Sequence, residues 1–243
     1  MLGGAGSAAN LIGFCDEPKV SKKLSGLPQC PKFLHLVMAN YHIPLLPGKI
    51  YHVFSRAVGS EQLFRELANY QFFLSRFQKH LSSVAHTLAY SLLPNHFHCM
   101  LRIKDEPSIK DHFLKVKTKK TFVPELAAEF VMERISNLLN SYTKAYNKMY
   151  NRKGALFIDY CRRVAIENDS QFGATVFYIH KNPVHHGYCK SMENWHWSSY
   201  NAFISDKPTA LCRQEVLEWF GGIKGFVDYH SQPIFPKDYA ELE

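Results

Sequence analysis

The chain has 243 residues, 46% of them hydrophobic and 14% aromatic, so it is long enough to bury one sizeable core. Its formal charge of +8 favours a polyanionic partner, nucleic acid before membrane, and no run of about 18 apolar residues is present to span a bilayer. The six cysteines form no Cys-x-x-Cys pair, which argues against a zinc ribbon or a small disulfide scaffold and favours a reducing, cytoplasmic setting.

The first half of the chain is predicted to alternate between strand and helix. Residues 1–37 contain scattered Gly and Pro and show no sustained period, so we expect a flexible N-terminal extension there. Residues 50–56 alternate as a β-strand does, and residues 61–82 carry apolar side chains at helical spacing. The apolar run 89–103 predicts a second strand, or a pair of strands interrupted at Pro94.

The second half is predicted to be mainly helical. Residues 104–121 are polar and rich in lysine, which indicates a solvated loop or a patch that contacts a nucleic-acid backbone. A long helix is expected over 124–149, a strand-like piece begins at 155–157, and a further helix covers 170–182 until Pro183 stops it.

A terminal helix is expected over 211–220. The order strand, helix, strand, helix, helix predicts an α+β fold with an antiparallel sheet and helices packed on one face.

Two histidines in the second strand form the first candidate site. Residues 94–98 read Pro-Asn-His-Phe-His, and side chains two residues apart leave the same face of a strand. His96 and His98 can therefore hold one metal ion between them, while Phe97 enters the core. Taken alone, the pair is equally compatible with two packed or solvated histidines.

Tyr178 and Asn182 form the second candidate site, because residues four apart share one face of a helix. If that face lies over the histidine pair, the amide oxygen becomes a third ligand, and such a set suits Mg²⁺ or Mn²⁺ better than a structural zinc. The phenol is then aimed at the group that the metal polarises, and a phenolate attacking a phosphodiester conserves the bond energy in a phosphotyrosine. A buried structural tyrosine is the competing interpretation.

Four motifs in sequence order carry a family resemblance: Pro94-Asn-His-Phe-His98, Gly154-Ala-Leu-Phe157, Tyr178-Ile-His-x-Asn-Pro-Val-His-His-Gly187 and Trp197-Ser-Ser-Tyr200. Together they resemble the single-tyrosine HUH transposases, and among these the REP-associated tyrosine transposases. The resemblance implies a ferredoxin-like fold with the two histidines on a central strand and the tyrosine on a catalytic helix. It also implies a metal-dependent single-strand DNA endonuclease and strand transferase, which forms a 5′-phosphotyrosine and leaves a free 3′-OH.

Carried over residue by residue, the resemblance makes Tyr178 the nucleophile and His96, His98 and Asn182 the ligands of Mg²⁺ or Mn²⁺. It implies single-stranded DNA flanked by a hairpin as the partner, no membrane partner, action as a monomer or homodimer, and a location at the nucleoid. The corresponding organisation is an N-terminal extension at 1–37, an HUH transposase catalytic domain at 38–204 and a C-terminal helical extension at 205–243.

Several basic and aromatic residues are further candidates. The following are expected to contact the DNA backbone, although a solvated basic surface explains them equally well: Arg152, Lys153, Arg162, Arg163, His185 and His186. Tyr142 is a second candidate nucleophile, but Tyr146 rather than an amide stands four residues later. Trp195, Trp197 and Tyr200 can stack on an unpaired base, yet core packing explains them better.

Two other functions compete with the transposase. A domesticated, non-catalytic protein that binds hairpin DNA would need none of the four catalytic residues that the sequence keeps. A metallohydrolase of small substrates would use His96 and His98, but no Glu stands next to them to act as a base, and its substrate does not explain the charge of +8.

Overall fold

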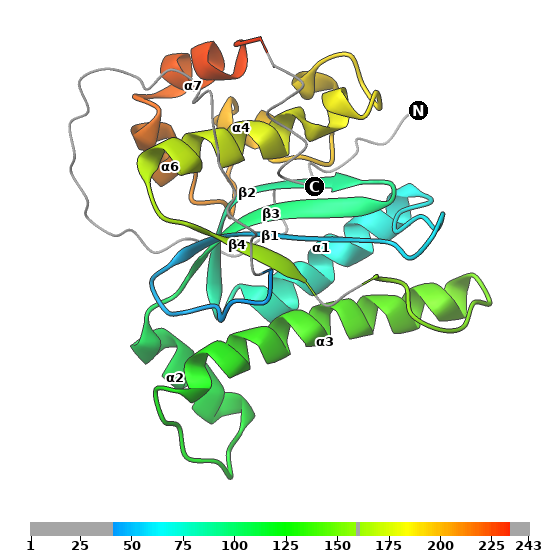
Figure 1. The fold of residues 1–243 in the computed structure, drawn as a ribbon, viewed down its shortest axis with the longest axis vertical. Coiled ribbons are helices and arrows are strands. Elements are labelled where there is room, and N and C mark those ends of the chain that lie inside the picture. The colour runs from blue at the N-terminus through cyan, green and yellow to red at the C-terminus, as the bar shows by residue number, and fades with distance from the viewer. Residues whose placement is uncertain (1–40, 159–160, 234–243) are drawn as a thin grey trace.

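The computed structural model describes residues 41–158 and 161–233, so the predicted extension at 1–37 lies outside the described residues. Four strands form one sheet in the order β2-β3-β1-β4, with every pairing antiparallel (Figure 1). The strands are β1 (Ile50–Arg56), β2 (Ala85–Leu93), β3 (His96–Ile103) and β4 (Arg162–Ile166).

Helix α1 (Leu67–Leu81) connects β1 to β2, and α2 (Glu106–Val116) with α3 (Leu126–Met149) connects β3 to β4. This is the ferredoxin-like order. The predicted α+β class with an antiparallel sheet is confirmed.

The two faces of the sheet are covered by different helices, as Figure 1 shows. On one face Phe97 packs against Phe73 of α1, with 5.2 Å between the ring centroids, and α3 packs against α1. On the other face α4 (Asp169–His185) lies over β2 and β3. Helices on one face were predicted, which is right for α1 and α3 and wrong for α4. Because β3 is buried on both faces, each face needs a cover.

The segment predicted as a polar loop at 104–121 contains α2. Its N-terminus is well defined, because the Asp105 side chain accepts a hydrogen bond from the Ser108 N–H at 3.1 Å and Pro107 occupies the first turn. Ile109 and Phe113 are the buried residues of this helix. With two buried positions in three turns, the apolar stripe was too sparse to reveal the helix.

Two other boundaries were wrong. The helix expected from residue 61 begins at Leu67, because Leu63 and Phe64 enter the core from a non-helical segment. The strand expected to begin at 155–157 is a single bridge between Ala57 and Phe157, and the fourth strand starts later in the chain.

Helix α4 does not stop at Pro183 but continues to His185. The proline stands in the last turn, and the helix ends in a Schellman motif. In this motif Gly187 adopts a φ of +73° and the Tyr188 N–H donates to the Pro183 carbonyl at 2.9 Å. His185 therefore lies on the helix rather than beyond its end, and His186 is the residue that caps it.

The C-terminal part adds η2 (Met192–Asn194), α5 (Tyr200–Phe203), α6 (Arg213–Trp219) and α7 (Ile223–His230). The helix predicted over 211–220 corresponds to α6, and α7 was not predicted. Buried side chains of α6 and α7 belong to the same continuous core as the sheet. None of the helices within 41–158 and 161–233 has the length and hydropathy needed to cross a membrane.

The segment after η2 covers the outer edge of β2. The Leu92 N–H donates to the Trp197 carbonyl at 2.8 Å, and the Ser199 N–H donates to the Tyr90 carbonyl at 2.9 Å. Ser91 and Ser198 form a bridge between these two bonds. The last of the four motifs in the sequence is therefore paired along an edge strand.

Gly173 marks a close approach between α4 and α6. A Cβ at this position would overlap the Trp219 ring and lie 3.1 Å from the Tyr229 hydroxyl. That ring is held between Phe172 and Phe220, so we expect Gly173→Ala to lower the free energy of unfolding by about 1–3 kcal/mol in urea titrations followed by circular dichroism. Helix propensity alone predicts stabilisation of about 1 kcal/mol, and that result would contradict the close packing.

Candidate active site

Strand β3 presents His96 and His98 on one face of the sheet, with Phe97 on the other. β3 is an inner strand, flanked by β2 and β1. The two imidazoles lie 5.2 Å apart between centroids and are perpendicular to each other. His98 is buried and His96 is half-buried.

Helix α4 brings the other two predicted residues to the same place. Oδ1 of Asn182 lies 2.9 Å from Nε2 of His96. The ring of Tyr178 stands perpendicular to that of His98, with 5.2 Å between centroids. The helix face that carries Tyr178 and Asn182 therefore lies over the histidine pair, and all four side chains meet in one cluster.

The contact between His96 and Asn182 has the chemistry of a cation site. Nδ1 of His96 lies 2.7 Å from Oδ1 of Asn95, an acceptor, so Nδ1 carries a proton and Nε2 of the neutral ring presents a lone pair. That lone pair faces the Asn182 oxygen, a second acceptor. Either a second proton on the imidazole or a cation can satisfy both acceptors.

The distances also fit a divalent ion. Neighbouring ligands of octahedral Mg²⁺, each about 2.1 Å from the ion, are about 3.0 Å apart, close to the 2.9 Å between the His96 nitrogen and the Asn182 oxygen. Nδ2 of Asn182 is buried without a hydrogen-bond partner in the described part of the chain, so the amide makes its polar contact through oxygen. No group of three His, Cys, Asp or Glu side chains at 41–158 and 161–233 is arranged to hold a metal. The residues that could hold an ion here are the two imidazoles of His96 and His98 and the Asn182 amide.

His98 is kept neutral by its surroundings. Burial, with smaller contributions from neighbouring histidines, holds the pKa of His98 well below its usual value of 6.5. Its Nδ1 lies 2.9 Å from Nε2 of His52, a fully buried residue of β1 whose pKa burial lowers to about 3. Two neutral imidazoles share one proton at this contact. When His98 Nδ1 donates it, His98 Nε2 is left as a ligand atom.

His52 and Asn95 were missed by the sequence reasoning. His52 stands at an alternating position of a strand that was predicted correctly, so a histidine on the face shared with His98 was a usable signal. Using this signal requires the pairing of β1 with β3. Phe54 is paired with His98, and His52, two residues before Phe54, lies on the same face. Asn95 precedes His96 in the first motif, but its contact to Nδ1 depends on the turn between β2 and β3.

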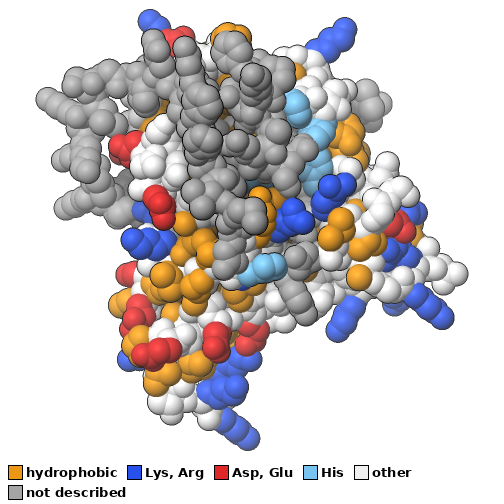
Figure 2. All heavy atoms as spheres, viewed as in Figure 1, with side chains coloured by type: hydrophobic (Ala, Val, Ile, Leu, Met, Phe, Trp, Pro, Cys, Tyr) orange, Lys and Arg blue, Asp and Glu red, His pale blue; other side chains and the backbone are white. Residues whose placement is uncertain are grey.

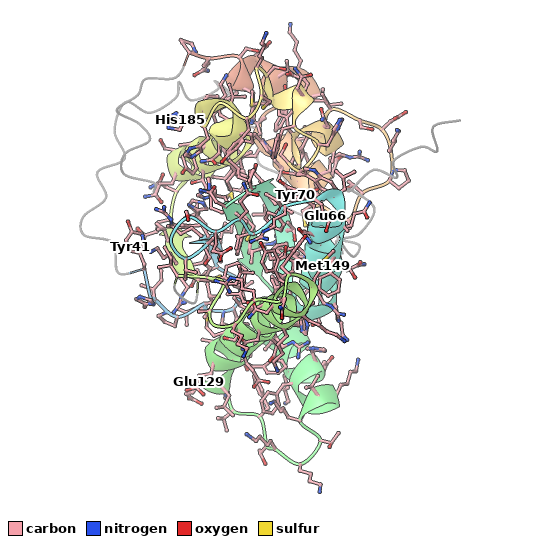
Figure 3. The ribbon with its side chains drawn as sticks, turned by 90° about the vertical axis from the view of Figure 1, so that its right-hand side faces the viewer. Tyr41, Glu66, Tyr70, Glu129, Met149 and His185 are labelled. Carbon is pink, nitrogen blue, oxygen red and sulfur yellow. The ribbon has the colours of Figure 1, made fainter. Side chains whose placement is uncertain are left out.

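A pocket of about 130 Å³ opens beside the histidine pair. Phe54 and Ile158 supply apolar walls, Arg56 and Arg162 supply two guanidinium groups, and His186 joins His96 and His98 in the lining. Tyr41, which contacts Phe54 and Arg162 of the lining, lies in Figure 3 on the same side of the molecule as His185. The pocket combines positive charge with apolar surface next to the predicted ligands.

The six predicted DNA-contacting residues divide into three groups. Arg162 and His186 line the pocket, and the His185 ring contacts the His186 ring at 5.1 Å. Lys153 is exposed. Arg152 and Arg163 are placed differently.

The guanidinium group of Arg163 is not available to DNA. It donates to the carbonyls of Ile43 at 2.5 Å and of His42 and Cys161 at 2.9 Å, and the residue is 7% exposed. Arg162 and Arg163 are neighbours in β4, so they leave opposite faces of the sheet and only Arg162 reaches the pocket. The prediction of a DNA contact is therefore wrong for Arg163.

Arg152 also has a structural role. Its guanidinium donates to the Glu61 carboxylate at 2.9 Å, the Asn147 amide oxygen at 3.1 Å and the Ala155 carbonyl at 2.7 Å. These bonds fix the turn after α3, so the predicted DNA contact is replaced by contacts within the protein.

The other candidates lie outside the cluster. The Tyr142 hydroxyl donates to the Leu63 carbonyl in the core, so this tyrosine is not presented to a substrate. Trp197 stacks on Tyr70 with 4.5 Å between centroids, and Tyr200 is buried, in agreement with core packing.

A separate buried relay lies on the far side of α4. His180 Nδ1 lies 3.0 Å from His230 Nε2 on α7, and His180 Nε2 lies 2.7 Å from the Ser199 hydroxyl. Nδ1 of His230 donates to the Phe226 carbonyl at 2.7 Å, so His230 Nε2 is an acceptor. His180 Nδ1 then donates to His230 Nε2, and His180 Nε2 accepts from the Ser199 hydroxyl. The relay ties the helix that bears Tyr178 to α7 and to the segment that covers β2.

No protein-family model matches the sequence, and no curated protein matches it. Among solved structures, the chain is similar to a REP-associated tyrosine transposase bound to a REP hairpin, with a TM-score of 0.52 and 18% sequence identity. The match covers 72% of this chain and 92% of that chain. The structural likeness agrees with the resemblance of the four motifs, and the chain has the fold of a REP-associated tyrosine transposase.

Proposed function

We propose that this protein is a DNA transposase that cuts and rejoins single-stranded DNA through Tyr178. The observation that carries the proposal is the meeting of a phenol, an amide oxygen and two imidazoles from α4 and β3 in one cluster. The fold shared with a REP-associated tyrosine transposase supports the same class of reaction. The formal charge of +8 supports a nucleic-acid substrate.

His96, His98 and Asn182 would hold a divalent Mg²⁺ or Mn²⁺. When bound, such an ion neutralises the non-bridging oxygens of the phosphodiester that is attacked. Asn95 and His52 orient the two imidazoles by their contacts to the Nδ1 atoms, which directs the Nε2 atoms to the ion.

Arg56 and Arg162 would position the strand. They come from β1 and β4, two neighbouring strands, and both line the pocket beside the histidines. Guanidinium groups bind phosphate oxygens through paired hydrogen bonds, so the two side chains can hold the backbone near the scissile bond. Phe54 and Ile158 offer apolar contact to an adjacent base.

In the cutting step the Tyr178 oxygen attacks the phosphorus and a bond forms between them. The bond from phosphorus to the 3′ oxygen breaks, that oxygen leaves and takes up a proton as a 3′-OH, and the phenol proton passes to solvent. Attack of another 3′-OH on the phosphotyrosine reverses the step and joins the strand. Tyr178 is 2% exposed and does not line the pocket, so the reaction requires its hydroxyl to come within bonding distance of a phosphorus there.

The test uses oligonucleotides with a hairpin and single-stranded flanks, incubated with Mn²⁺. The wild-type protein should form a covalent adduct, seen on denaturing gels, that carries the label of a 3′-labelled strand but not of a 5′-labelled one. Tyr178→Phe should form no adduct and bind the same DNA with unchanged affinity, because it loses only the phenol oxygen.

Tyr142→Phe is the matched control, since its hydroxyl is engaged in the core and the adduct should persist. Chelation with EDTA should abolish the wild-type adduct. An adduct formed by Tyr178→Phe would show that another residue is the nucleophile.

The burial of Tyr178 favours one second candidate, a non-catalytic protein that binds hairpin DNA. The same experiment separates the two functions. Wild-type protein that binds equally with and without divalent metal, and nicks none of the hairpin-flanked strands, would be the second candidate.

A further inference from the structure

An aromatic row leads away from the candidate site at the end of α4. His186 contacts the ligand candidate His96, with 4.8 Å between ring centroids, and also lines the pocket. Tyr188 follows at 6.3 Å from His186, and Trp195 at 5.8 Å from Tyr188. Neighbouring rings in the row are inclined by 43° and 35°. The aromatic row, His186, Tyr188 and Trp195, is thus continuous with the pocket.

The row is held in place although it lies at the surface. The Trp195 indole N–H donates to the Leu92 carbonyl of β2 at 3.0 Å, and the Tyr188 N–H donates to the Pro183 carbonyl in the Schellman motif. Tyr188 is nevertheless 41% exposed. By contrast, Tyr70 stacks on Trp197, is 6% exposed and belongs to the core. An exposed aromatic ring on a fixed backbone is typical of a binding surface.

The surroundings fit a nucleic-acid strand. Figure 2 shows histidine side chains at the surface over the end of α4, next to Lys and Arg side chains. Figure 3 looks onto this end of the molecule, where His185 marks the end of α4 and Tyr70 the first turn of α1. Arg162 and Ile158 stand in the pocket with His186, so a strand held in the pocket by its phosphates can continue from His186 onto the row.

We propose that unpaired bases of the DNA strand that leaves the pocket stack on the aromatic row, chiefly on Tyr188. The proposal rests on the proposed function, since it takes the pocket as the place of the scissile phosphate. Stacking on an aromatic ring tolerates any base because every base has a π-face. The row therefore supplies affinity for single-stranded DNA next to the cut, independent of sequence and of the metal.

The experiment measures binding of two fluorescent 12-nucleotide strands by anisotropy, in EDTA so that neither metal nor cleavage contributes. One strand is oligothymidine, and the other has the same phosphates but abasic sugars. Tyr188→Leu should weaken binding of oligothymidine about 10-fold and leave binding of the abasic strand unchanged. Tyr188→Phe keeps the ring and should bind both strands as the wild type does.

Two controls separate stacking from other causes. The slope of binding against salt should be the same for Tyr188→Leu and the wild type, since no phosphate contact is removed. Leu114→Ala removes a side chain that is 42% exposed on α2, outside the row, and should leave both affinities unchanged.

Equal loss on the two strands, or unchanged binding of oligothymidine by Tyr188→Leu, would overturn the stacking proposal. Failure of the proposed function is recognised separately. If the wild type forms no adduct but Tyr188→Leu still loses base-dependent affinity, the row binds DNA and the nuclease assignment fails. If the adduct forms and the base-dependent loss is absent, the nuclease assignment stands and the stacking proposal fails.

Discussion

His96→Ala should weaken Mn²⁺ binding at least about 100-fold, because removing even a residue that only orients a ligand costs 10- to 100-fold in metal affinity. Isothermal titration of the DNA-free protein gives the affinity without any assay of cleavage. Asn95→Ala removes the acceptor at His96 Nδ1, and its Mn²⁺ affinity should lie between those of the wild type and His96→Ala, with a loss of about 10- to 100-fold. This order follows from the contacts of a single imidazole.

His186→Ala is the control that makes this experiment sharp. The His186 ring is as close to His96 as His98 is, but it is not in the proposed ligand set. Its removal should change the Mn²⁺ affinity by less than about threefold, well short of the loss expected even for a residue that only orients a ligand. If His186→Ala costs as much as His96→Ala, His186 is also a ligand and the proposed set of two histidines and an amide is wrong.

His230→Leu should lower the free energy of unfolding by about 2–4 kcal/mol. The substitution removes the acceptor of His180 Nδ1 and leaves that donor buried, since His180 is 0% and His230 1% exposed. The packing of the His230 ring on Phe226, 4.0 Å away between centroids, is lost as well. Urea titration followed by circular dichroism measures the change.

His185→Leu makes the same chemical change at an exposed position of α4 and should alter stability by less than about 0.5 kcal/mol. His230→Gln retains an acceptor and should recover part of the loss. Equal effects of the two leucine substitutions would mean that the relay contributes nothing to stability.

Much of the candidate site follows from local periodicity. Two residues along a strand place His96 and His98 on one face, and four residues along a helix place Tyr178 beside Asn182. These relations hold wherever the strand and helix form, so the sequence predicts each pair. The meeting of the two pairs depends on how α4 packs on the sheet, and only the resemblance of the motifs predicts that packing.

The errors arise where long-range placement decides the outcome. Arg162 and Arg163 are equally basic, and only the start of β4 determines that one reaches the pocket and the other is buried. His52 becomes relevant only once β1 is aligned with β3. The helix continues past Pro183 to His185, because a proline in a last turn removes only one backbone donor.

The segment paired along β2 has a consequence for self-association. An outer strand with open N–H and C=O groups invites a second copy to extend the sheet. Here the bonds of Leu92 and Tyr90 to residues 197 and 199 already occupy that rim, and on the opposite rim the Arg163 N–H is bonded to the Tyr41 carbonyl. A second copy therefore could not extend the sheet by pairing with Tyr90 and Leu92 of β2, because those backbone groups are already bonded within the same chain.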